Sequence, residues 1–191
     1  MDTQISLLKS AERAVRQRGY DGFSYADLAD EIGIRKASIH YHFPRKANLG
    51  LAVVERYSAR FFEALSDITE ADGSAAAQLR SYIQIYRDAL ANGEQVCLCV
   101  SLSAGRDSLS PEMLDQLNLF HSKSVAWLTN VFERAAADGT LKSHAAPRDD
   151  AFSTLALVEG AQLLARSRKD VTVFDQALAS MIGRLAKPPV D

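Results

Sequence analysis

The chain lacks the features of secreted and membrane-spanning proteins. Its 191 residues include two cysteines, Cys97 and Cys99, which are too few for a disulfide scaffold. No apolar run reaches the roughly 18 to 20 residues that a membrane span needs. The N-terminal segment shows no basic start followed by an apolar block. We therefore expect reduced thiols, a cytoplasmic location and no membrane partner.

Catalytic and metal-binding motifs are also missing. Four histidines and two cysteines would permit a Cys/His pair. The sequence nevertheless contains no nucleophile elbow, glycine-rich phosphate loop or metalloprotease spacing. We predict no catalytic residue, no metal and no cofactor, so an enzyme is not expected.

Acidic residues are absent from one stretch, between Glu31 and Glu55, although the whole chain has a net charge of −2. The first fifty residues hold eight Lys/Arg against six Asp/Glu, whereas the remainder holds fourteen against eighteen. The acid-free stretch contains Arg35, Lys36, His40, His42, Arg45 and Lys46. A cationic patch on an otherwise acidic chain favours a nucleic-acid partner.

The hydrophobic pattern is helical, because apolar residues recur every three and four positions and no strand pattern competes. We predict an all-α fold of about nine helices, at residues 4–19, 25–32, 35–41, 44–68, 75–92, 96–107, 111–138, 149–168 and 172–187. The chain contains no Gly/Ser linker. The long fourth helix therefore joins a small N-terminal domain (1–46) to a larger helical domain (47–187), and 188–191 form a tail.

Residues 24–43 have the pattern of a helix-turn-helix. A capped helix turns at Gly33 into a second short helix, and both are expected to pack on the first helix through Ile5, Leu8 and Val15. Arg35 and Lys36 open the second helix, where the helix dipole disfavours cations unless a phosphate or base edge compensates. A solvated surface pair is the alternative.

The same segment resembles the TetR family of transcriptional regulators, over about residues 5–50. The residues that carry the resemblance are Gly22, Phe23, Leu28-Ala29, Ile32-Gly33-Ile34, the run Ser38 to Pro44, Lys46 and Leu49. Beyond residue 50 the resemblance is one of architecture.

The resemblance implies two kinds of contact with double-stranded operator DNA. Tyr41, His42 and Lys46 match phosphate contacts, and Arg35, Lys36 and Ser38 match positions that face base edges. Ser24 and Tyr25 match the start of the helix before the turn. His40 stands where the family usually has tyrosine, and Tyr25 where threonine or valine is commoner. Phe23, Ile39 and Phe43 are expected in the core.

The resemblance also implies that 1–46 form a DNA-binding domain and 47–187 a ligand-binding and dimerisation domain. It predicts a homodimer built from the last two helices, together with an unidentified small-molecule effector. Each of those helices has an apolar stripe, and either stripe can face its own core or the partner. Ten candidate effector-binding residues could equally be core residues: they are Tyr57, Phe61, Tyr82, Tyr86, Cys97, Cys99, Phe120, His121, Trp127 and Gln162.

Cys97 and Cys99 allow three interpretations: ordinary buried cysteines, a reactive thiol that senses electrophiles or oxidants, or a soft-metal site with His121. Residues two apart on a helix point about 200° away from each other, so a sensor would use one thiol.

The function that fits these features is allosteric repression. The dimer would hold two recognition helices about 34 to 36 Å apart, and a bound ligand would favour the wrong spacing. Activation of transcription is an alternative outcome, and a helical interaction module that binds no DNA is an alternative class.

Overall fold

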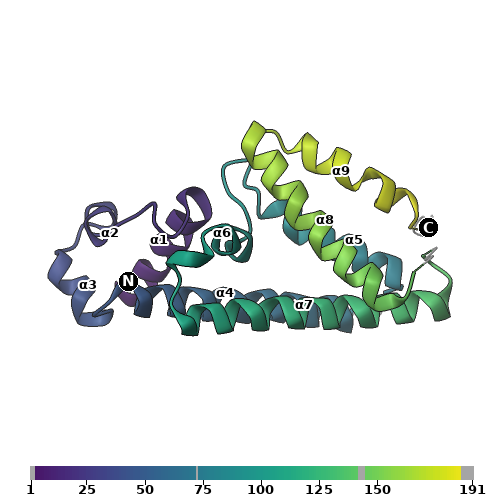
Figure 1. Ribbon diagram of the computed structural model, residues 1–191, viewed down its shortest axis with the longest axis horizontal. Helices are drawn as coiled ribbons and strands as arrows, with labels where there is room; N and C mark the ends of the chain where they lie inside the picture. The colour runs from purple at the N-terminus through teal and green to yellow at the C-terminus, as the bar shows by residue number, and fades with distance from the viewer. Residues whose placement is uncertain (1–2, 72, 142–144, 186–191) are drawn as a thin grey trace. The chain divides into compact units, whose positions relative to one another are not determined.

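The computed structural model describes residues 3–71, 73–141 and 145–185. Across these ranges the chain forms nine α-helices and one short 3-10 helix (Figure 1). They are α1 (Thr3–Arg18), α2 (Tyr25–Ile32), α3 (Lys36–His42), α4 (Lys46–Glu70), α5 (Ala75–Asp88), α6 (Leu98–Ala104), η1 (Arg106–Ser108), α7 (Pro111–Asp138), α8 (Pro147–Arg168) and α9 (Thr172–Gly183). The predicted all-α class is confirmed. The predicted tail, 188–191, lies outside the described residues, but the last helix ends at Gly183 and not at 187 as predicted.

Several predicted boundaries differ from the structure. The fourth helix begins at Lys46 and not at Pro44, because Phe43, which precedes the proline, is extended (φ −134°, ψ 90°). The fifth helix ends at Asp88, and the turns after it include three residues with positive φ, at 91–93. The sixth helix is shorter than predicted and spans Leu98–Ala104.

The helices group into two compact units. Residues up to Arg60 and Cys97–Phe120 form the first, here called the N-terminal unit; Phe61–Val96 and the residues from His121 onward form the C-terminal unit. Helices α4 and α7 each continue from one unit into the other. The predicted boundary between a DNA-binding domain and a ligand-binding domain, at residues 46 and 47, concerns function and stays a prediction.

In the N-terminal unit α1 packs on α2, and α2 packs on α3. The buried stripe of α1 includes Leu7, Ala11 and Val15. The prediction that Ile5 joins it is wrong, since Ile5 is 45% exposed. At about 100° per residue Ile5 lies roughly 120° around the helix from the centre of that stripe.

A buried carboxylate links α1 to α4 inside the N-terminal unit. The Glu12 side chain is 10% exposed, and the Arg60 guanidinium donates to its two oxygens at 2.8 and 2.7 Å. Arg56 and Arg16 lie 3.4 and 3.8 Å from the same carboxylate. Because a buried charge is costly without partners, this cluster fixes the two helices against each other.

The C-terminal unit places α8 beside α9 and also against α5 (Figure 1). Arg87 of α5 donates two hydrogen bonds to the Asp175 carboxylate of α9, at 2.7 and 2.8 Å. Among the described residues, no helix is both long and apolar enough to span a bilayer.

Candidate nucleic-acid interface and ligand region

Capping residues define the two ends of α2. Ser24 caps its start: the Ser24 hydroxyl accepts a hydrogen bond from the Asp27 amide, and the Asp27 carboxylate accepts one from the Ser24 amide. The Ser24 hydroxyl also donates to this carboxylate at 2.8 Å, and this bond, followed by the one from the Ser24 amide, lowers the pKa of Asp27. Gly33 ends the helix in the left-handed region at φ 70°, which favours glycine. A Cβ at Gly22 would lie 2.3 Å from the Arg18 carbonyl oxygen, so the approach to α2 also requires glycine.

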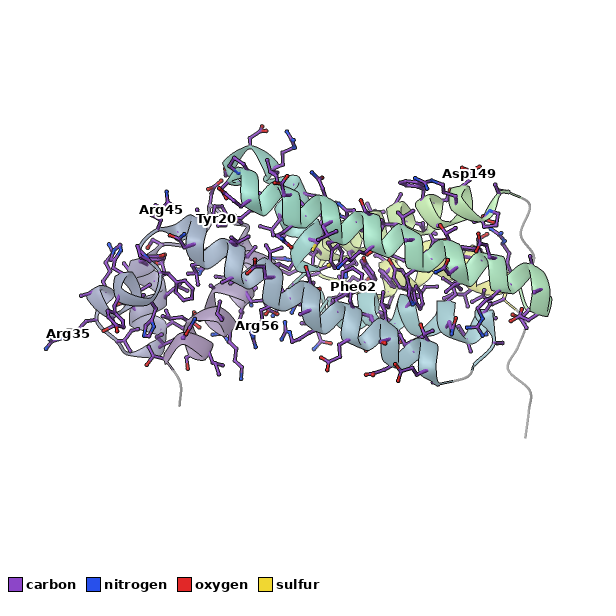
Figure 2. All side chains as sticks on the ribbon, turned by 90° about the horizontal axis from the view of Figure 1, so that it is seen from below. Tyr20, Arg35, Arg45, Arg56, Phe62 and Asp149 are labelled. Atoms are coloured by element: carbon purple, nitrogen blue, oxygen red, sulfur yellow. The ribbon has the colours of Figure 1, made fainter. Side chains whose placement is uncertain are left out.

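Helix α3 is anchored by one side chain and otherwise presents its residues to solvent. Ile39 is completely buried. Arg35, Lys36 and His40 are exposed, and Ser38 and His42 are half-buried. Tyr41 is 84% exposed, and Figure 2 shows Arg35 extended away from the ribbon. The structure therefore brings six of the nine predicted DNA-binding side chains together on this short helix and its N-cap.

Tyr25, another predicted DNA-binding residue, does not lie on this exposed surface. Its ring is buried, and its hydroxyl donates to the carbonyl oxygen of Phe43 at 2.8 Å. Burial raises the pKa of Tyr25 to about 12. The His40 ring contacts the Tyr25 ring edge-on, with 4.9 Å between centroids. Tyr25 therefore connects the start of α2 to the end of α3.

Lys46 is also engaged within the unit. Its ammonium donates to the Phe23 carbonyl oxygen at 2.7 Å. The same nitrogen lies 4.7 Å from the ring centroid of Tyr20 and 4.2 Å from that of Phe23, within the range of cation–π attraction. Burial lowers the pKa of Lys46. Its side chain thus holds the segment that leads into α2.

The ten predicted ligand-binding residues are divided between the two units. Phe61, Tyr82, Tyr86 and Trp127 form an aromatic cluster in the C-terminal unit, with Trp127 stacked on Tyr82 at 5.5 Å between centroids. The hydroxyls of Tyr82 and Tyr86 are 3.4 Å apart. Gln162 donates to the Tyr86 carbonyl oxygen at 2.5 Å. These polar groups therefore have partners inside the core.

Tyr57, Phe120, Cys97 and Cys99 lie in the N-terminal unit. Cys97 is the N-cap of α6 and Cys99 lies in its first turn; both are buried. The Tyr57 hydroxyl donates to Cys97 Sγ at 3.2 Å. Burial, and next the nearby Cys97, raise the pKa of Tyr57. In the described part of the chain, no group of three or more His, Cys, Asp or Glu side chains could hold a metal ion.

Four large apolar side chains of α8 and α9 are exposed: Phe152, Leu163, Leu164 and Ile182. Other apolar side chains of this region are buried within their own unit, namely Leu155, Ala161, Phe174, Leu178 and Leu185. A shallow hollow of about 610 Å³ runs along α8 beside Gly160 and Leu164 and reaches Ala177 of α9. The sequence alone could not separate these two sets.

Two family models match the chain. Residues 7–53 match the bacterial regulatory proteins of the tetR family, and residues 75–181 match the tetracyclin repressor-like C-terminal domain. The chain belongs to the TetR family. Its members bind operator DNA and usually act as dimers, so this TetR-family chain is a DNA-binding transcriptional regulator and not an enzyme.

Individual TetR-family proteins are similar over nearly the whole chain. The transcriptional repressor NemR of Escherichia coli is 26% identical over 192 residues, which cover 99% of this chain and 96% of NemR. A TetR-family regulator from Agrobacterium tumefaciens has a solved structure with a TM-score of 0.90 and 30% identity, covering 96% of this chain and 97% of that one. The reduced form of E. coli NemR has a TM-score of 0.83 at 26% identity, with full coverage of both chains.

Sequence reasoning missed two features of this TetR-family chain. The first is the Glu12 cluster, of which only the i,i+4 pair with Arg16 is visible in the sequence. The second is Glu159, which lies 3.4 Å from the predicted ligand residue His121. A charged residue within the apolar pattern of the eighth predicted helix was the signal that could have identified Glu159.

Proposed function

We propose that this chain is a ligand-responsive repressor that binds its operator as a homodimer, with the exposed face of α3 in the major groove. The observation that carries the proposal is the exposure of Arg35, Lys36 and Tyr41 on a helix whose Ile39 is completely buried. Arg and Lys can donate to guanine edges, and a tyrosine hydroxyl can donate to a phosphate. Because its target is chromosomal DNA, we also place its action in the cytoplasm.

Within this proposal the nine predicted DNA-binding residues have two different roles. Arg35, Lys36, Ser38, Tyr41 and His42 contact DNA. His40 lies at the edge of that surface, with its Nδ1 atom 3.3 Å from the Pro44 carbonyl oxygen. Ser24, Tyr25 and Lys46 hold α2 and α3 in position, because their polar groups are used in the cap and in bonds to backbone carbonyls.

The DNA-binding role is tested by titrating the protein into DNA from the region upstream of its own gene and measuring the affinity. We expect Arg35→Ala and Lys36→Ala to weaken binding to the preferred sequence by about tenfold or more each, since a good base contact is worth about 1–3 kcal/mol. Lys9→Ala, at an exposed position on α1, is the matched control for charge. Loss of affinity in the control equal to that in Lys36→Ala would contradict the assignment.

The dimer would form through the exposed side chains of Leu163 and Leu164 on α8 and Ile182 on α9. Twofold symmetry suits a palindromic operator, and burying such side chains is the main gain of association. Leu164→Glu should shift the sedimentation of the protein towards the monomer. Leu119→Glu, at a leucine on α7 that is 43% exposed against 53% for Leu164, should leave the dimer intact. A dimer that survives Leu164→Glu would refute this interface.

A thiol-based form of the same response rests on the hydrogen bond from Tyr57 to Cys97. Modification of Cys97 would remove that bond and would require α6 to open, because the residue is 1% exposed. Operator release by an electrophile should then be lost in Cys97→Ser and retained in Cys99→Ser. Equal responses in both variants would leave the two cysteines as ordinary core residues.

A further inference from the structure

A cleft between α7 and α8 in the C-terminal unit has the size of a small-molecule site. Its volume is about 690 Å³, and sites for small molecules are commonly about 300–1,000 Å³. Residues of both helices line it, and the two helices run in opposite directions (Figure 1). The aromatic cluster described above is not part of its lining.

One end of this cleft holds a shielded carboxylate. His121 Nε2 lies 3.4 Å from Glu159 Oε1, and the two side chains are 28% and 20% exposed. That contact is an ion-pair distance without hydrogen-bond geometry. The buried Oε1 accepts no hydrogen bond among the described residues. Because the Glu159 side chain as a whole keeps 20% exposure, a ligand in the cleft that donates to this carboxylate would gain a charge-assisted bond.

The other end carries the opposite charge. Arg148 precedes Glu159 by eleven residues on α8, which is about 16 Å along a helix. The Arg148 guanidinium lies 5.6 Å from the centroid of the Phe152 ring, and Asn130 of α7 also lines the cleft. An arginine and an amide together are well suited to a carboxylate.

The wall between the two ends is apolar. It includes Val125 and Ala126 of α7, and Phe152 and Leu155 of α8. The cleft therefore presents a cation, an apolar strip and an anion in that order along about 16 Å of helix.

We propose that this cleft binds an elongated organic acid with a hydrogen-bond donor at its far end, of the ω-amino or ω-hydroxy carboxylic acid class. Arg148 pairs with the carboxylate of the ligand, the chain lies along Phe152 and Leu155, and the terminal donor meets Glu159. The effector role of this ligand rests on the repressor function proposed above; its binding does not.

Calorimetric titration of the full-length dimer, without DNA, tests the site. The probes are ω-aminododecanoate, dodecanoate and dodecylamine, each below its micelle-forming concentration. We expect ω-aminododecanoate to bind about tenfold more tightly than either single-ended probe, because each charge-assisted bond is worth roughly tenfold or more in affinity.

Two variants separate the two ends. Glu159→Gln should remove the advantage of ω-aminododecanoate over dodecanoate, and Arg148→Gln should weaken both acids while leaving dodecylamine unchanged. Glu133→Gln and Arg168→Gln, at exposed positions of the same helices, are the matched controls. Circular dichroism of each variant confirms that its fold is intact.

Three results would overturn the proposal: equal affinity for all three probes, insensitivity to both cleft variants, or binding only by a monomeric Leu164→Glu variant. The last would show that a second copy of the chain fills the cleft. Tight, variant-sensitive binding that leaves operator affinity unchanged would support the site and contradict ligand-responsive repression.

Discussion

The exposed face of α3 and the aromatic cluster of the C-terminal unit place similar chemical groups in opposite environments. On α3 the Tyr41 side chain is 84% exposed, whereas Tyr82 and Tyr86 are 0% and 1% exposed. The hydroxyls of Tyr82 and Tyr86 lie near each other, and the Tyr86 carbonyl accepts from Gln162. Under the proposed function, we expect the exposed α3 side chains to contribute to recognition with little effect on stability. We expect the buried cluster to contribute to stability with little effect on recognition.

The largest effect on stability is expected for Tyr86→Ala. Removing a buried aromatic ring leaves a cavity and should lower the free energy of unfolding by about 3–5 kcal/mol. Urea unfolding at fixed protomer concentration measures this change. DNA affinity per folded molecule should stay within about twofold, which is within about 0.4 kcal/mol.

Tyr86→Phe is the control for the ring, because it removes only the hydroxyl. It should cost about 1 kcal/mol or less. A Tyr86 variant that lost DNA binding while remaining as stable as the wild type would contradict the expectation that the aromatic cluster acts on stability and not on recognition.

Lys46→Met tests an intermediate case, a cation predicted to contact phosphate but bonded inside the protein. Loss of the bond to Phe23 and of the ring contacts should cost about 1–2 kcal/mol of stability. The salt dependence of DNA affinity should not change, because no phosphate contact is removed. A decrease of about one in the slope of log affinity against log salt would show that Lys46 neutralises a phosphate.

Asp175→Asn should have a small, pH-dependent effect confined to the C-terminal unit. The hydrogen bonds from Arg87 lower the pKa of Asp175, so the carboxylate stabilises the fold above its unfolded pKa near 4. Because both side chains are about 40% exposed, the stabilisation at neutral pH should be about 0.5 kcal/mol.

The pH profile checks the sign of this effect. The stability difference between wild type and Asp175→Asn should be constant near neutral pH. It should shrink as the pH falls through the lowered pKa. A difference that grows in acid would contradict the role of the Arg87–Asp175 pair.

The sequence predicted most of the helices and the helix-turn-helix because these depend on local patterns. Ser24, Asp27 and Gly33 act within a few residues of one another, and the spacing of apolar residues marks each buried stripe. The Glu12 cluster could not be predicted, since Arg56 and Arg60 follow more than forty residues later. The internal orientation of Lys46 depends on where a long, flexible side chain finds its partners, and the α7–α8 cleft depends on how two helices pack.

Comparison of Tyr41→Ala with Tyr25→Phe, by fluorescence anisotropy on upstream DNA at one fixed salt concentration, tests the central claim most directly. Both tyrosines belong to the predicted DNA-binding set, but one is exposed and the other is bonded to the Phe43 carbonyl. Tyr41→Ala should change stability by less than about 0.5 kcal/mol and weaken DNA binding clearly. Tyr25→Phe should cost about 1 kcal/mol of stability and leave the affinity of the folded protein unchanged. Wild-type affinity in Tyr41→Ala would contradict the assignment of the exposed face of α3 as the DNA-binding surface.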